Sequence, residues 1–220
     1  MGGGVPGERR VGVHDGPGDV AEWRLERAAQ RLRRAGVSNA ERRVLADERD
    51  PWVKHHTKSF DRVFVDAPCL GIGTWRRNPD AKWRARPGDL AELVVRQQAI
   101  LKSAARLVKP GGRLIYATCS LLREEDEAQA EAFLAATPDF ALYPIAQAWE
   151  ETIGGECPGG SDFLRLTPAR HGTDGFFVAV FERKALPRKD HPQPDPRPQA
   201  GEGASHKALP QNPPPQAGEG

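Results

Sequence analysis

The sequence is poor in cysteine, in long apolar runs and in net charge, and each shortage excludes a class of protein. Three cysteines without a signal peptide argue against a disulfide framework and favour a reducing compartment. No run approaches the roughly 18 apolar residues that a membrane-spanning helix needs. With 32 basic and 30 acidic side chains, the net charge of +2 does not by itself identify a nucleic-acid binder. We therefore expect a cytoplasmic protein whose partners must be inferred from local clusters.

The composition also predicts how the chain divides. Residues 1–18 show neither helical nor strand periodicity, so an irregular segment is expected there. Residues 185–220 are rich in proline, glycine and glutamine and repeat the string PQAGEG, which predicts a disordered tail. Between them, residues 19–184 are long enough for one domain with its own core.

Two short motifs each follow an apolar run, and together they hold two of the three cysteines. The string Asp66-Ala67-Pro68-Cys69 follows the apolar run at 63–65, and Ala117-Thr118-Cys119-Ser120 follows the run at 114–116. In a doubly wound α/β sheet, ligands bind beyond the carboxyl ends of the strands. Both cysteines and Asp66 are therefore predicted to face one cleft. The alternative for each cysteine alone is a small buried hydrophobic residue.

A stretch of cations and tryptophans comes directly after the first motif. Its members are Trp75, Arg76, Arg77, Lys82, Trp83, Arg84 and Arg86. Cations contact phosphates and aromatic rings stack on bases, so this stretch is a candidate nucleic-acid surface. The alternative is an ordinary basic loop.

Several helices and strands are predicted around these motifs. Asp19 is a candidate cap for a helix that stops at Gly36, and a short strand is expected at 44–46, just before Asp47. A long helix is expected from Asp89 to a turn at 109–112.

The second half of the chain predicts one more helix and an antiparallel edge. The acidic run at 124–127 is expected to open a helix and to complement its dipole, without a catalytic role. Strands are expected at 141–143, 163–166 and 175–181, of which the last two resemble an antiparallel sheet edge.

These strings resemble the Fmu/Sun family of RNA cytosine-5 methyltransferases, which use S-adenosylmethionine. The resemblance runs from about Asp19 to about Lys184. It includes Asp66 to Thr74, Arg76-Arg77-Asn78-Pro79-Asp80, Lys109 to Ser120 and His171 to Phe177. It implies an α/β fold, the Rossmann-like class I methyltransferase sheet with helices on both faces. The family's first strand, glycine-rich cofactor loop and second strand would precede Asp19, and we expect this chain to lack them.

The resemblance also implies roles for individual residues. Cys119 matches the nucleophile that adds to carbon 6 of cytosine, Cys69 the group used in the later elimination, and Asp66 a contact to cytosine and cofactor. Asp19 matches the residue at the cofactor ribose and Asp47 a contact to its adenosine portion. Arg76, Arg77, Lys82 and Arg84 are the expected RNA contacts. The predicted function is methyl transfer from S-adenosylmethionine to a cytosine of rRNA or tRNA through a covalent cysteine adduct.

Two other functions stay open at this point. One is a truncated, catalytically inactive RNA-binding remnant that binds the cofactor weakly, because the cofactor loop is expected to be missing. The other is thiol redox chemistry, which the 50-residue spacing of Cys69 and Cys119 and the lack of a Cys-x-x-Cys string disfavour. No metal site is expected, since His55 and His56 have no further ligands at zinc spacing, and no oligomer is indicated.

Overall fold

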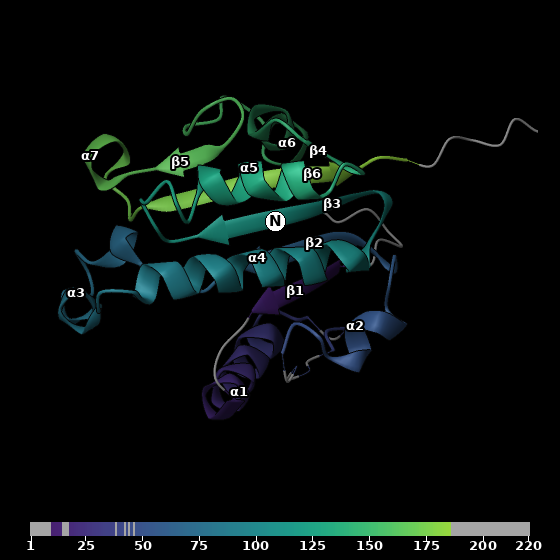
Figure 1. Cartoon of the computed structure of the whole chain (residues 1–220), viewed down its shortest axis with the longest axis horizontal. Coiled ribbons are helices and arrows are strands. Elements are labelled where there is room, and N and C mark those ends of the chain that lie inside the picture. Colours follow the sequence, from purple (N-terminus) through teal and green to yellow (C-terminus); the bar gives the residue numbers. More distant parts are fainter. Residues whose placement is uncertain are drawn as a thin grey trace, which may run out of the picture. The chain divides into compact units, whose positions relative to one another are not determined.

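The computed structural model describes residues 10–14, 18–37, 39–41, 43, 45 and 47–185 of the chain (Figure 1). The helices are α1 (Gly18–Arg34), α2 (Pro51–His55), α3 (Asp80–Arg84), α4 (Asp89–Leu107), α5 (Glu127–Ala136), α6 (Ile145–Thr152) and α7 (Pro168–His171), with a 3-10 turn at Ile72–Thr74. The strands are β1 (Arg10–His14), β2 (Phe60–Asp66), β3 (Val108–Thr118), β4 (Phe140–Leu142), β5 (Leu164–Leu166) and β6 (Phe176–Arg183). The tail predicted at the C-terminal end lies outside the described residues, apart from Ala185.

The strands form one mixed sheet in the order β1-β2-β3-β6-β4, with β5 also paired to β6. Strands β1, β2 and β3 are parallel, and β6 is antiparallel to β3, β4 and β5. The expected antiparallel edge is therefore confirmed. In the β2–β3 register Asp66 lies opposite Ala117, so both strands end at the same edge of the sheet.

One face of the sheet makes the core with α4 and α5, which lie over the same side of it in Figure 1. Val63, Val65, Leu114 and Tyr116 point to that face and are fully buried. Burying each such side chain contributes about 1.5–3 kcal/mol relative to exposure. Side chains alternate along a strand, and Phe64, between two buried valines, stays 45% exposed on the opposite face.

The expectation of an irregular segment over residues 1–18 is wrong at residues 10–14. These residues form β1, which pairs in parallel with β2 and places Val11 opposite Val63. Five residues with a glycine in the middle carry little periodicity of their own. These residues form a strand because β2 supplies their hydrogen-bond partners, and a local sequence pattern contains no information about a strand that lies about 50 residues away.

Three smaller expectations also differ from the structure. Helix α1 begins at Gly18, so Asp19 lies in its first turn and does not cap it. Leu45, the described residue of the strand expected at 44–46, has no regular structure. The turn expected at 109–112 is part of β3, where Gly111 takes a positive φ of 75°.

No helix in the described ranges is long and apolar enough to cross a membrane.

The long helix α4 packs against the core along one side. Ile100, Leu101, Ala104 and Leu107 follow helical spacing and are nearly inaccessible to solvent.

Candidate functional site

The structure brings the two motif cysteines into contact beyond the ends of β2 and β3. Cys69 Sγ and Cys119 Sγ lie 3.4 Å apart, within hydrogen-bonding range for sulfur. The parallel register explains this proximity, because Asp66 lies opposite Ala117 and each cysteine follows within three residues of this pair. Both side chains are partly exposed and neither forms a disulfide. Two thiols in contact at the ligand-binding edge of a sheet can divide one proton between them.

This contact makes the two sulfurs chemically different. With Cys69 as the donor, the hydrogen bond from its thiol lowers the pKa of Cys119. The same hydrogen bond, followed by burial and by the charge of Cys119, raises the pKa of Cys69. Cys119 is therefore the sulfur that ionises first, and a thiolate is the nucleophilic form of cysteine.

The loop after Cys69 is held against two other segments through backbone contacts. The Gly73 N–H donates to the carbonyl oxygen of Cys119 over 2.9 Å, and the Gly175 N–H donates to the Gly73 carbonyl over 2.9 Å. A Cβ atom on Gly73 would lie only 2.4 Å from the Gly175 oxygen. Gly175 lies in the string His171 to Phe177, for which no contact to the cysteines was predicted, and it closes one side of the cysteine site.

Glu125 is a buried residue of the site that the sequence interpretation missed. Its carboxylate accepts hydrogen bonds from the Leu70 N–H (3.0 Å), from Gln97 Nε2 (3.1 Å) and from Ser120 Oγ (2.5 Å). Helix α5 begins only at Glu127, and Glu125 is 0% exposed, so complementing the helix dipole does not account for it. A single acidic residue within an acidic run gives no sequence signal for such a position.

Asp126 is also buried, on the other side of the same turn. Its carboxylate accepts from Thr118 Oγ1 over 2.6 Å and pairs with Arg165 over 3.1 Å. Burial is the main cause that raises the pKa of Asp126 to about 6. The acidic run therefore contributes two buried carboxylates that brace the end of β3.

The three aspartates expected at the cofactor are described to different extents. Asp66 is exposed at the carboxyl end of β2. Asp47 is exposed, and its Oδ1 accepts from the Arg49 N–H over 2.7 Å. The side chain of Asp19 lies outside the described part. Among the described residues no group of three His, Cys, Asp or Glu side chains could hold a metal ion.

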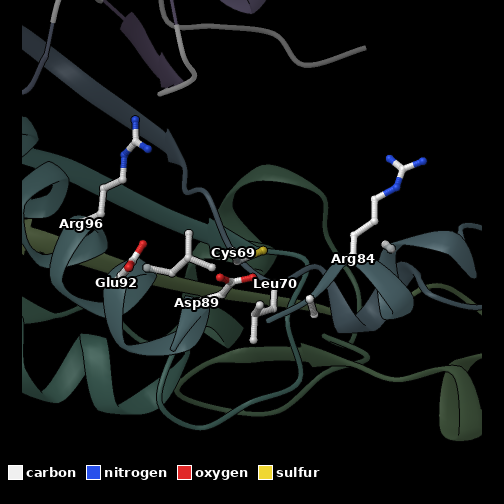
Figure 2. Close-up of a pocket in the computed structure, with 9 residues that line it drawn as sticks. Cys69, Leu70, Arg84, Asp89, Glu92 and Arg96 are labelled. Carbon is white, nitrogen blue, oxygen red and sulfur yellow. The ribbon is translucent and has the colours of Figure 1, made fainter. Parts of the chain in front are cut away.

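An open pocket of about 420 Å³ lies beside Cys69 (Figure 2). Its walls come from the loop after β2 and from α3 and α4. The lining residues are Cys69, Leu70, Ala81, Arg84, Ala85, Asp89, Glu92, Leu93 and Arg96. In Figure 2 the sulfur of Cys69 lies between the side chains of Arg84 and Arg96. One of the four expected RNA-binding cations therefore borders the cysteine site directly.

The other three expected cations lie on exposed surface near this pocket. Arg77 pairs with Asp174, and Arg76 Nη2 donates to the Gly172 carbonyl over 3.4 Å. The Lys82 ammonium lies 5.4 Å from the centre of the Trp83 ring, and Trp83 is 80% exposed. A tryptophan this exposed beside cations can stack on a ligand ring.

Comparisons with known proteins agree on one family. A sequence model described as 16S rRNA methyltransferase RsmB/F matches residues 17–182. The chain is 40% identical over 166 residues to a probable ribosomal RNA small subunit methyltransferase B of Synechocystis. It is 41% identical over 166 residues to ribosomal RNA small subunit methyltransferase B of Salmonella arizonae. Each alignment covers 76% of this chain and 36% of the relative, so the chain spans about a third of the length of the curated relatives it matches.

A solved structure supports the fold. The crystal structure of PH0851 shares 33% sequence identity and a TM-score of 0.70, over 81% of this chain and 43% of that chain.

Proposed function

Because the chain belongs to the 16S rRNA methyltransferase RsmB/F family, we propose that it carries the cysteine centre of an RNA (cytosine-5)-methyltransferase. The observation that carries this proposal is the 3.4 Å contact between Cys69 Sγ and Cys119 Sγ. The substrate is a cytosine of small-subunit rRNA, the RNA named for the relatives, and the methyl donor is S-adenosylmethionine.

The acceptor groups at the sheet edge fit this cofactor. Carboxylate oxygens accept from sugar hydroxyls and from amino groups, which are the donors on an adenosine. Asp66 and Asp47 expose such carboxylates. When bound, S-adenosylmethionine supplies an electrophilic methyl group.

The cysteine pair answers the main difficulty of the reaction, since carbon 5 of cytosine is a poor nucleophile. The Cys119 thiolate adds to carbon 6 and forms a carbon–sulfur bond, which moves electron density to carbon 5. Asp66 holds the ring by hydrogen bonding near nitrogen 3. Addition needs an exposed face of the base, so the target cytosine is unpaired or flipped out.

The same contact prepares Cys69 for the second half of the reaction. The hydrogen bond to Cys119 and the charge of Cys119 are among the causes that raise the pKa of Cys69. Once the Cys119 sulfur is bonded to carbon, both causes disappear and Cys69 can lose its proton to solvent. Carbon 5 then carries both its original proton and the methyl group that bound S-adenosylmethionine would supply. The Cys69 thiolate removes that proton, and the electron pair expels the Cys119 sulfur from carbon 6. Cys69 ends protonated and Cys119 ends as a thiolate, as they began.

The RNA lies along the exposed cationic surface beside the pocket. Arg76, Arg77, Lys82 and Arg84 contact its phosphates, and the 80% exposed ring of Trp83 stacks on a base near the target.

A denaturing gel of cysteine variants incubated with small-subunit rRNA and S-adenosylmethionine tests the proposal. Cys69→Ala should attack and methylate and then stall, giving a slow-migrating band that nuclease removes. Cys119→Ala should give no band and no methylation. Cys157→Ala is the matched control: it also removes a thiol, and it should behave like the unaltered chain.

Two results would contradict the proposed roles. A nuclease-sensitive band for Cys119→Ala but not for Cys69→Ala would reverse them. No band for any variant, together with no methylation by the unaltered chain, would refute the covalent mechanism for this chain.

A further inference from the structure

We propose that Glu125 is a positioning residue that ties the two cysteine loops together and so keeps the two sulfurs in contact. The chemical purpose of that contact rests on the proposed function. The positioning itself rests on hydrogen bonds of the free chain.

The two carboxylate oxygens of Glu125 serve different loops. Oε1 accepts from the N–H of Leu70, the residue after Cys69, over 3.0 Å. Oε2 accepts from the hydroxyl of Ser120, the residue after Cys119, over 2.5 Å. The loops are about 50 residues apart in sequence and meet on one rigid planar group. A shift of either loop would break a hydrogen bond to the shared carboxylate, and hydrogen bonds to charged acceptors are among the stronger ones in proteins.

Glu125 is itself held from two further directions. Gln97, on α4, donates from Nε2 both to Glu125 Oε1 over 3.1 Å and to the carbonyl of Pro68 over 2.8 Å. The hydroxyl of Tyr116, in the centre of β3, donates to the Glu125 carbonyl over 2.7 Å. Gln97 and Tyr116 are both fully buried, so Glu125 is fixed to the core through its carboxylate and through its backbone carbonyl.

The charge of Glu125 and its geometry act on Cys119 in opposite directions. The negative charges of Glu125 and Asp66 each raise the pKa of Cys119, while the hydrogen bond from Cys69 lowers it and is the largest effect. A purely electrostatic role therefore predicts that neutralising Glu125 makes Cys119 more acidic. A positioning role predicts the reverse, because the sulfurs separate and Cys119 loses its donor.

Glu125→Gln distinguishes the two roles with the free chain, without RNA or cofactor. A glutamine amide keeps the size of the side chain but has only one acceptor oxygen, so the Ser120 hydroxyl must turn and accept from the amide NH2 group. The short hydrogen bond to a carboxylate is thereby replaced by a weaker neutral one, and the hold on that loop loosens. We expect the pH profile for alkylation of Cys119 by iodoacetamide to move up by about one unit, a roughly tenfold slower reaction at neutral pH. Peptide mass spectrometry assigns the alkylated cysteine. The matched control is Glu124→Gln, which removes the same charge from the exposed neighbour and should leave the profile unchanged.

A second measurement reads the distance between the sulfurs directly. Diamide oxidises two adjacent thiols to a disulfide and takes up their two protons and two electrons. Cys69–Cys119 disulfide formation should be several-fold slower in Glu125→Gln than in Glu124→Gln. Ser120→Ala removes the Oε2 contact and, with it, the hydrogen bond from the Leu122 N–H to Ser120 Oγ over 3.1 Å. It should slow disulfide formation as well, so the proposal stays testable if Glu125→Gln does not fold.

Two outcomes would overturn the positioning role. One is a Cys119 profile that moves to lower pH in Glu125→Gln, and the other is an unchanged disulfide rate in Ser120→Ala. Neither measurement uses methyl transfer, so a failed gel assay for the proposed function would leave this inference standing. Equally, failure of the positioning role would leave the proposed methyl transfer standing.

Discussion

Replacing Gly73 by alanine should loosen the cysteine site through a steric clash alone. The φ of Gly73 is not among the positive values of the described glycines, so an alanine can adopt its backbone conformation. Its Cβ, however, would lie 2.4 Å from the Gly175 oxygen and 2.7 Å from the Gly175 Cα. Ordinary contacts begin near 3.4 Å, so the two loops must separate by about 1 Å.

The loss of stability in Gly73→Ala can be estimated from the contacts that the separation of the two loops disturbs. Overpacking of this kind costs about 1–3 kcal/mol. Moving the loops also weakens the Gly73–Cys119 and Gly175–Gly73 backbone hydrogen bonds, at about 1 kcal/mol each. We expect a loss of about 3–5 kcal/mol in the free energy of unfolding, which corresponds to a fall in Tm of roughly 6–20 °C for a chain of this size.

Gly111→Ala is the comparison for this experiment. Gly111 has a φ of 75° with nothing within 4 Å of its would-be Cβ, so alanine there meets only backbone strain, about 1 kcal/mol. Thermal unfolding of both variants, followed by circular dichroism, compares a clash with a strained backbone. If Gly73→Ala costs no more than Gly111→Ala, the close approach of the two loops does not hold them together.

Two further predictions concern charge and RNA. Asp126 has a folded-state pKa of about 6, above its ordinary value of 3.8, so ionisation of this carboxyl opposes folding. Its contribution to the free energy of unfolding is therefore most favourable below about pH 4 and is lost as the pH rises through 6. In urea titrations, the free energy of unfolding of Asp126→Asn, measured relative to the unaltered chain, should therefore rise by up to about 3 kcal/mol between pH 4 and pH 7. A difference in stability that does not change with pH would contradict this. In fluorescence anisotropy with single-stranded RNA, Arg84→Gln should reduce the salt dependence of log Kd by about 0.7, whereas Trp83→Ala should cost about 1–3 kcal/mol with an unchanged slope. Equal slopes for the two variants would show that Arg84 does not contact a phosphate.

The contact between the cysteines was predictable from the sequence, and the reason is the sheet. Apolar runs before Asp66 and before Ala117 mark two parallel strands, and parallel strands of one sheet end at one edge. The long helix α4 was also predictable, because its apolar stripe recurs at helical spacing over about five turns.

The features that the sequence did not reveal depend on distant partners. Strand β1 is defined by its neighbour β2. Glu125 stands in an acidic run typical of a first helical turn, and only the tertiary structure brings the Leu70 N–H and Gln97 to it. Local pattern reports which residues prefer a helix or a strand, and it carries no information about which buried donor meets which acceptor.

The place of β3 in the sheet has a consequence for how long the site persists. β3 is hydrogen-bonded along both edges, by β2 on one side and β6 on the other, and Leu114 and Tyr116 in its middle are inaccessible to solvent. Such amides exchange their hydrogens with water only when the whole sheet opens, whereas the three-residue strands β4 and β5 can fray separately. Cys119 directly follows the last residue of β3, so its backbone is anchored to a strand whose amides we expect to exchange slowly. Thermal fluctuations that open β4 or β5 alone should leave the Cys119 backbone in place.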